Sequence, residues 1–114
     1  MNERAKIILD FWFVEASPKE QFNSSDEFDK KIKERFFEDY QKAITNEYDH
    51  WQDNAKECLA LIILLDQFSR NLFRNNSKAF AMDYKALIIA KNAIDKEYHK
   101  TLPNSQILFI FLPL

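Results

Sequence analysis

The absence of glycine is the feature that most limits what this chain can fold into. None of its 114 residues is a glycine, although an average protein contains about 7%. Tight two-residue hairpin turns, phosphate-binding loops and dinucleotide-binding fingerprints all need glycine, because it enters positive-φ conformations at little cost. The chain is therefore expected to be all-α and to lack nucleotide-binding sites of these kinds.

The length and the apolar content together predict one domain. Hydrophobic residues make up 46% of the chain and include 11 Phe and 2 Trp. A chain of this size hides roughly two-thirds of its unfolded surface on folding, which is enough for an aromatic core without disulfides or metal. We expect residues 1–114 to form a single helical domain.

The charges argue against nucleic acid as a partner. Lysine and arginine contribute 16 residues and aspartate and glutamate 18, for a formal net charge of −2, and the two signs are mixed along the chain. No basic patch is expected from such a pattern. The longest apolar run, residues 58–65, is far shorter than the roughly 20 residues of a membrane span, and the N-terminus is unlike a signal peptide. These features predict a cytoplasmic protein with no membrane partner.

Cysteine and histidine give no sign of a metal or cofactor site. Cys58 is the only cysteine and lies within an apolar run, which is typical of a buried structural thiol. His50 and His99 are far apart in the sequence and do not have the spacing of zinc ligands. We expect no metal and no cofactor.

The hydrophobic spacing predicts about five helices, paired as antiparallel helical hairpins. Helical periodicity covers residues 3–14, the stretch from Ser24–Glu27 to Ile44, and residues 55–72 and 78–98, with an apolar segment at 105–114. Ser17–Glu20 has the spacing of a capping box and predicts a short extra turn of helix. Ser24 and Glu27 repeat this spacing, which predicts Ser24 as the cap of the second helix. In the second helix, Asp29 is expected on the solvated outer face.

The third and fourth helices are expected to form the centre of the domain. Residues 59–65 are apolar on all sides, so this helix must be covered by others. The fourth helix is predicted to bury one face, flanked by alanines that allow close packing. That face consists of Phe80, Leu87, Ala90 and Ile94.

A row of charged residues follows the apolar part of the third helix. Four-residue spacing aligns Asp66, Arg70 and Arg74, and both cations are arginine although the chain has three times as many lysines. Asp83 falls on the expected apolar face of the fourth helix, where an ionised carboxylate needs a partner. We therefore predict a partly or fully buried ion pair between Asp83 and Arg70 or Arg74.

Two interpretations of this polar cluster stay open. The charged network can simply fix how two helices dock. Alternatively, the cluster can bind a small anionic or amide-containing ligand, or be the relic of an enzyme site. No catalytic residue is predicted, because Ser69 has no histidine near it in the sequence. The candidate ligand-binding residues are Asp66, Gln67, Arg70, Asn71, Arg74 and Asp83.

The C-terminal segment predicts self-association. No charged side chain follows Lys100, and apolar residues would occupy every side of a helix formed by residues 107–114. A small domain can cover only one of these sides, so another molecule is expected to cover the rest. We predict a homodimer or larger assembly with Phe109, Phe111 and Leu112 near the centre of its interface.

The sequence resembles a known family along its whole length. The matching motifs are residues 8–13, Phe28-Asp29, residues 59–74, Ala79-Phe80-Ala81 with Asp83, Leu102-Pro103 and residues 109–114. They resemble the mainly bacterial family called domain of unknown function 924. The family usually has proline at the position of Ser69 and Gly-Thr-Pro near residues 75–77.

The resemblance implies an all-α, tetratricopeptide-like fold and no established activity or cofactor. Family members typically continue with a His-Ser-Glu motif and further helices, so the chain resembles the N-terminal two-thirds of a longer family domain. A family site built from these parts would be incomplete here. Tetratricopeptide-like folds often bind proteins, so a protein-interaction module is the first functional hypothesis. The alternative is the ligand or relic-enzyme site around Asp66, Arg70, Asn71 and Asp83.

Overall fold

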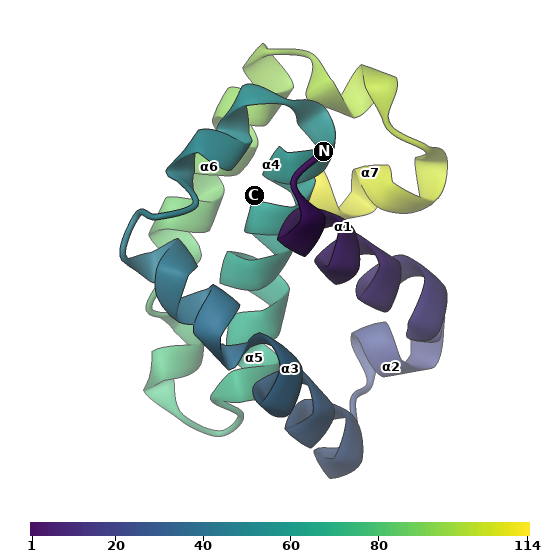
Figure 1. Cartoon of the computed structure of the whole chain (residues 1–114), viewed down its shortest axis with the longest axis vertical. Coiled ribbons are helices and arrows are strands. Elements are labelled where there is room, and N and C mark those ends of the chain that lie inside the picture. The colour runs from purple at the N-terminus through teal and green to yellow at the C-terminus, as the bar shows by residue number, and fades with distance from the viewer.

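A computed structural model describes residues 1–114, which form helices and no strands (Figure 1). The predicted all-α class is confirmed, whereas the tetratricopeptide-like pairing into hairpins stays a prediction. No helix is both long and apolar enough to cross a membrane. The α-helices are α1 (Glu3–Asp10), α2 (Pro18–Phe22), α3 (Asp26–Ile44), α4 (Ala55–Ile62), α5 (Ser69–Leu72), α6 (Asp83–Asp95) and α7 (Asn104–Phe111).

Side-chain caps fix where the N-terminal helices begin. The predicted capping box at α2 is confirmed: the Ser17 hydroxyl accepts from the Glu20 amide at 3.1 Å, and the Glu20 carboxylate accepts from the Ser17 amide at 2.9 Å. At α3 the cap is Ser25 rather than the expected Ser24. The Ser24 hydroxyl donates to Asp29 instead, at 2.8 Å.

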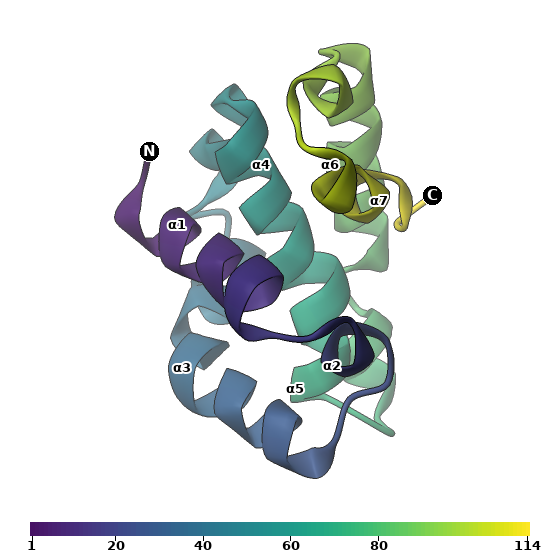
Figure 2. The same cartoon turned by 90° about the vertical axis from the view of Figure 1, so that its right-hand side faces the viewer.

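The central helix is continuous from α4 to α5 and contains a π-helical segment, Ile63–Phe68. Every residue from Cys58 to Leu65 is buried, so the prediction of a fully covered helix is confirmed. Figure 2 shows α4 with α1 on one side and α6 and α7 on the other. A second π-helical segment, Phe11–Glu15, follows α1 and places the Trp12 ring 5.6 Å from the Phe68 ring.

The turns place residues other than glycine at their positive-φ positions. Three residues adopt positive φ: Asn46 at 71°, Asn75 at 63° and Glu97 at 63°. Each lies just after α3, α5 or α6, where a helix commonly ends in the left-handed conformation. Asparagine is the residue that tolerates this conformation best after glycine, so two of the three turns use the next-best side chain.

The buried face of α6 differs from the one expected. Residues Ser77–Phe80 form a separate 3₁₀ turn, and α6 begins only at Asp83. Phe80 is exposed because it precedes the helix and does not share its phase, so its predicted place in the core is wrong. Small residues line the face that packs inward, as predicted; the buried residues of α6 are Ala86, Ile89, Ala90 and Ala93.

Helix α7 turns only part of its apolar surface inward. Phe109 is 2% exposed and lies within 6 Å of three aromatic rings, those of Trp12, Phe13 and Phe22. The prediction that Phe109 lies in an intermolecular interface is therefore wrong, because its own chain covers it. Phe111 and Leu112 remain exposed.

Substituting Phe109 by alanine should therefore be far more harmful than substituting Phe111. We expect Phe109→Ala to lower the free energy of unfolding by about 3–5 kcal/mol, since it leaves a cavity among aromatic rings. Phe111 is 39% exposed, and Phe111→Ala should cost less than about 1 kcal/mol. Urea unfolding of both variants, at a protein concentration where the chain is monomeric, measures the difference, and equal losses would contradict this placement of α7.

Candidate functional site

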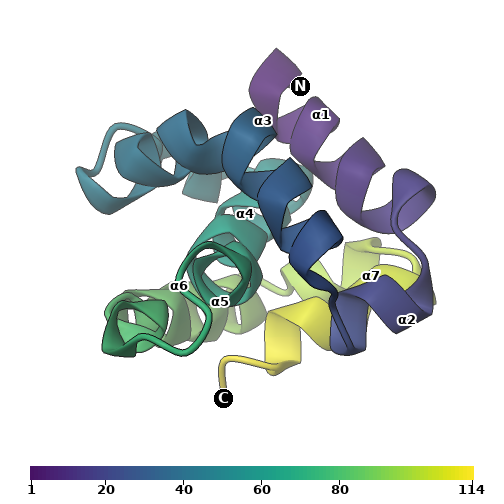
Figure 3. The same cartoon turned by 90° about the horizontal axis from the view of Figure 1, so that it is seen from below.

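The predicted site residues gather where the central helix ends. Asp66 lies in the π-helical segment, Arg70 and Asn71 lie in α5, and Arg74 lies in the turn that follows. Asp83, the first residue of α6, lies opposite Arg70. Figure 3 shows α5 between α3 and α6, so this polar cluster joins three helices.

Arg70 connects α5 to the start of α6. Its Nη1 and Nη2 atoms each donate to one carboxylate oxygen of Asp83, both at 3.2 Å. Nη1 also donates to the backbone carbonyl of Asp66, and the guanidinium lies over the Phe80 ring, 5.3 Å from its centroid. The predicted pairing is present, but the two side chains are 37% and 41% exposed, so the pair is only half-buried.

A second ion pair connects the turn after α5 to α3 through a residue that we expected in solvent. Asp29 accepts from Arg74 at both carboxylate oxygens, with 3.0 Å between Nη2 and Oδ1, and it accepts from Asn71 at 2.9 Å. The placement of Asp29 on the solvated face is therefore wrong. The sequence contains one indication of its true position: Asp29 directly follows Phe28, which is the first buried residue of α3.

Asp29 and Asp66 have opposite pKa shifts. Burial alone would raise the pKa of Asp29, but hydrogen bonds from Arg74, Asn71 and Ser24 outweigh burial and lower it. Asp66 is more deeply buried, and burial raises its pKa despite the nearby Arg70 charge and a 2.8 Å hydrogen bond from Gln67. Asp29 is thus held as an anion, whereas Asp66 binds a proton more readily than an ordinary aspartate.

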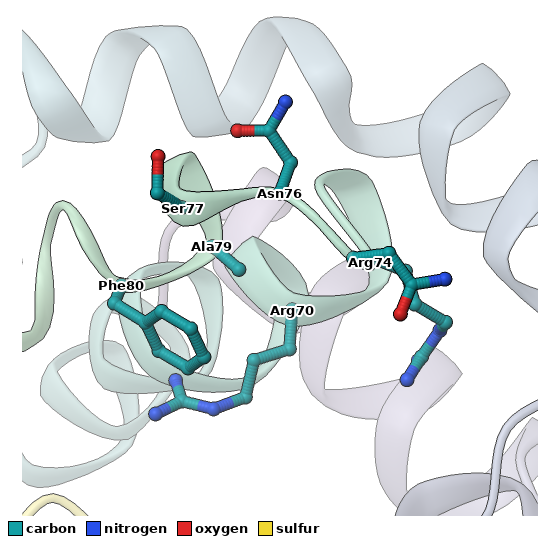
Figure 4. Close-up of a pocket in the computed structure, with 7 residues that line it drawn as sticks. Arg70, Arg74, Asn76, Ser77, Ala79 and Phe80 are labelled. Atoms are coloured by element: carbon teal, nitrogen blue, oxygen red, sulfur yellow. The ribbon is translucent and has the colours of Figure 1, made fainter.

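Two open hollows adjoin the arginines. The larger, of about 520 Å³, is lined by Arg70, Arg74, Phe80 and residues 75–77 and 79. Figure 4 shows the Asn76 and Ser77 side chains pointing away from both guanidinium groups. The polar groups of this larger hollow therefore do not converge on one ligand.

The smaller hollow, of about 260 Å³, lies between the end of α2 and α5. Gln67, Arg70, Asn71 and Arg74 line it from the central helix and the following turn, together with residues 21, 22, 24 and 112. The structure thus brings together four of the six candidate ligand-binding residues at one surface depression. Asp66 and Asp83 lie behind them and do not line it.

Neither an activated nucleophile nor a metal-ligand cluster is present. Ser69 is fully buried and its hydroxyl donates to the Asp66 carbonyl at 3.0 Å. Burial raises the pKa of the Cys58 thiol to about 12, which agrees with the predicted structural role. No group of three or more His, Cys, Asp or Glu side chains is placed to hold a metal ion.

Comparison with known proteins identifies the family. Residues 8–114 match the sequence model of a family described as bacterial protein of unknown function (DUF924). The chain belongs to this family. Among solved structures, this DUF924 chain matches a protein of unknown function from Agrobacterium tumefaciens, ATU0120, with 34% identity and a TM-score of 0.92. No curated protein matches the chain.

The DUF924 chain spans only part of the Agrobacterium protein. The alignment covers 96% of this chain and 62% of that one. The match of residues 8–114 to the family model confirms the family resemblance expected from the motifs. Neither description assigns an activity.

The half-buried geometry of the Arg70–Asp83 pair changes the expected effect of Asp83→Ala. Removing one partner of a fully buried pair would lower the free energy of unfolding by about 3–5 kcal/mol. For this solvent-screened pair at a helix N-terminus, we expect Asp83→Ala to lower it by about 1 kcal/mol. Asp26→Ala is the matched control, because Asp26 also begins a helix but forms no ion pair. Chemical denaturation should give the larger loss for Asp83→Ala, and equal losses would show that the Arg70 contact contributes nothing.

Asp29 and Asp66 should affect the acid stability of the domain in opposite directions. The folded-state pKa of Asp29 lies below its ordinary value of 3.8, so its stabilising contribution is complete above that value and is lost as the pH falls through the folded pKa. The raised pKa of Asp66 has the reverse sign: its contribution is present at low pH and is lost as the pH rises through the folded pKa.

These signs can be tested with isosteric variants. As the pH falls from roughly 5 to 2, the stability advantage of the wild type over Asp29→Asn should shrink. Over the same range the stability of the wild type relative to Asp66→Asn should increase. Urea unfolding at a series of pH values measures both trends, and parallel curves for the two variants would contradict the assignments.

Proposed function

We propose that this DUF924 domain is a helical protein-interaction module that associates with a second copy of itself through α7. One observation carries the proposal: α7 exposes a stripe of apolar side chains. Leu108, Phe111 and Leu112 are spaced i, i+3 and i+4, so they share one helix face, and all three are exposed. The opposite side of α7 supplies Phe109 and Ile110 to the core.

The chemistry of this stripe favours a second copy as the partner. A two-fold symmetric interface brings the same surface patch of both copies together, so a patch with charges of a single sign would repel itself. The chain carries no charged side chain after Lys100. The α7 stripe therefore meets no charge repulsion when it packs against its own copy, and burying it would remove leucine and phenylalanine side chains from water.

Compared with the interface predicted from the sequence, the proposed interface retains Phe111 and Leu112, includes Leu108 and excludes Phe109. It needs no rearrangement of the core, because Phe109 already fills its place there. Tetratricopeptide-like folds commonly bind proteins, which agrees with the proposal only at the level of fold analogy.

Sedimentation velocity over a concentration series tests the association. We expect a species of twice the 13.6 kDa chain mass that dissociates on dilution. Leu112→Lys should weaken the association by at least about 100-fold, because a symmetric dimer loses two buried leucines worth roughly 1.5–3 kcal/mol each.

Ile44→Lys is the matched control for this variant. Ile44 is 37% exposed and Leu112 41%, and each lies at the C-terminal end of a helix, where a lysine is electrostatically favourable. Ile44 ends α3 on the side of the molecule away from α7 (Figure 3). A wild-type protein that stays monomeric at every concentration, or equal weakening by both substitutions, would overturn the proposal.

A further inference from the structure

The smaller hollow between α2 and α5 combines polar and apolar walls. Its polar lining comes from the central helix and the following turn, together with Gln21 and Ser24, and its apolar wall is formed by Phe22 of α2 and Leu112 at the end of α7. Three segments that are distant in the sequence thus build one depression. Such a mixed lining is typical of sites that hold the apolar part of a small molecule and fix its polar end.

No carboxylate lines this hollow, although three carboxylates lie close behind it. The residues that line it include two arginines and no aspartate or glutamate. Asp29 is held behind Arg74, while Asp66 and Asp83 are bound to Arg70. The acidic partners therefore orient the guanidinium groups without facing the hollow themselves.

Several polar groups of the hollow have hydrogen-bonding capacity to spare. Arg74 uses Nε and Nη2 for Asp29, and its Nη1 makes no hydrogen bond within the protein. Gln67 and Asn71 each donate through their amide nitrogen, and their carbonyl oxygens accept nothing. A charged donor and neutral amide groups thus remain free beside an apolar wall.

We propose that this hollow binds a small carboxylate that carries an apolar group, such as an acylated amino acid or the C-terminal residue of a peptide. The carboxylate would accept from Arg74, and the amide groups of Gln67 and Asn71 would bond to the adjacent peptide unit. The apolar group would lie against Phe22 and Leu112. The volume of about 260 Å³ is below the ~300–1,000 Å³ of sites for drug-sized ligands, which agrees with a ligand of this size.

A pair of probes that differ only in charge tests the proposal. N-acetyl-L-leucine carries a carboxylate and a leucine side chain, whereas N-acetyl-L-leucinamide replaces the carboxylate by a neutral amide. Titration of the full, ¹⁵N-labelled chain with each probe follows the side-chain amide signals of Gln21, Gln67 and Asn71. We expect these signals to shift with the acid, and the neutral probe to bind at least about tenfold more weakly, because a charge-assisted hydrogen bond is lost.

Matched arginine variants locate the carboxylate. Arg74→Gln should weaken binding of the acid about tenfold or more, whereas Arg35→Gln should leave it unchanged. The two arginines are 42% and 38% exposed, and each is paired with one carboxylate, but Arg35 lies outside the hollow. In Arg74→Gln, Asp29 keeps its hydrogen bonds from Asn71 and Ser24, so the variant should fold.

A variant that leaves the ion pairs intact tests the apolar wall. Phe22 is exposed and takes no part in the charged network, so Phe22→Ala should weaken binding of N-acetyl-L-leucine several-fold without affecting Arg74. Equal affinity for the two probes would overturn the proposal. So would shifts confined to residues outside the hollow, or no shift at tens of millimolar probe.

Leu112 belongs both to this hollow and to the α7 stripe, so self-association would compete with the ligand. The titrations are therefore made at protein concentrations where sedimentation shows only the monomer. Failure of the ligand to bind leaves the mass measurement intact, and a monomeric protein can still bind the ligand.

Discussion

The complete burial of the middle of the central helix is the constraint on which the rest of the structure depends. A helix that is apolar on every side needs a neighbour on every side, and here α1, α3, α6 and α7 surround the stretch from Cys58 to Phe68. Aromatic side chains of the neighbouring segments meet at the C-terminal end of this stretch, where the ring of Phe68 contacts those of Phe11, Trp12 and Phe36. The short helices and turns connect these surrounding helices and position them against the central helix.

The polar end of the same helix determines how its neighbours are oriented. Hydrophobic packing is not directional, whereas a bidentate arginine–carboxylate pair fixes both distance and angle. Arg70 attaches the start of α6, and Arg74 attaches α3 through Asp29. The structural and ligand-binding interpretations of this cluster are therefore compatible, because the carboxylates that hold the helices also orient the guanidinium groups that line the hollow.

The sequence was sufficient for the fold class, the central helix and an ion pair between Asp83 and an arginine of that helix, but it did not decide between Arg70 and Arg74. It failed in two situations: where a turn changes the phase of a helix, and where a residue has a partner far away in the sequence. Phe80 fits the apolar spacing of α6, but the 3₁₀ turn of residues 77–80 separates it from that helix. Asp29 was misplaced because a long-range partner, Arg74, is invisible to local periodicity. Phe109 was predicted to need another molecule because aromatic partners more than eighty residues away in the chain could not be foreseen.

The glycine-free composition has a consequence for the unfolded state. A chain with average composition and this length would contain about eight glycines, each widening the range of backbone conformations open to the denatured chain. Their replacement typically contributes about 0.4–1 kcal/mol of stability per compatible site, so the denatured ensemble of this protein is unusually restricted. The three strained turns at Asn46, Asn75 and Glu97 oppose that gain with about 1–2 kcal/mol each at most. The restricted denatured chain thus offsets the strain in the native turns, and the protein loses less backbone entropy on folding than a chain of the same length with average glycine content.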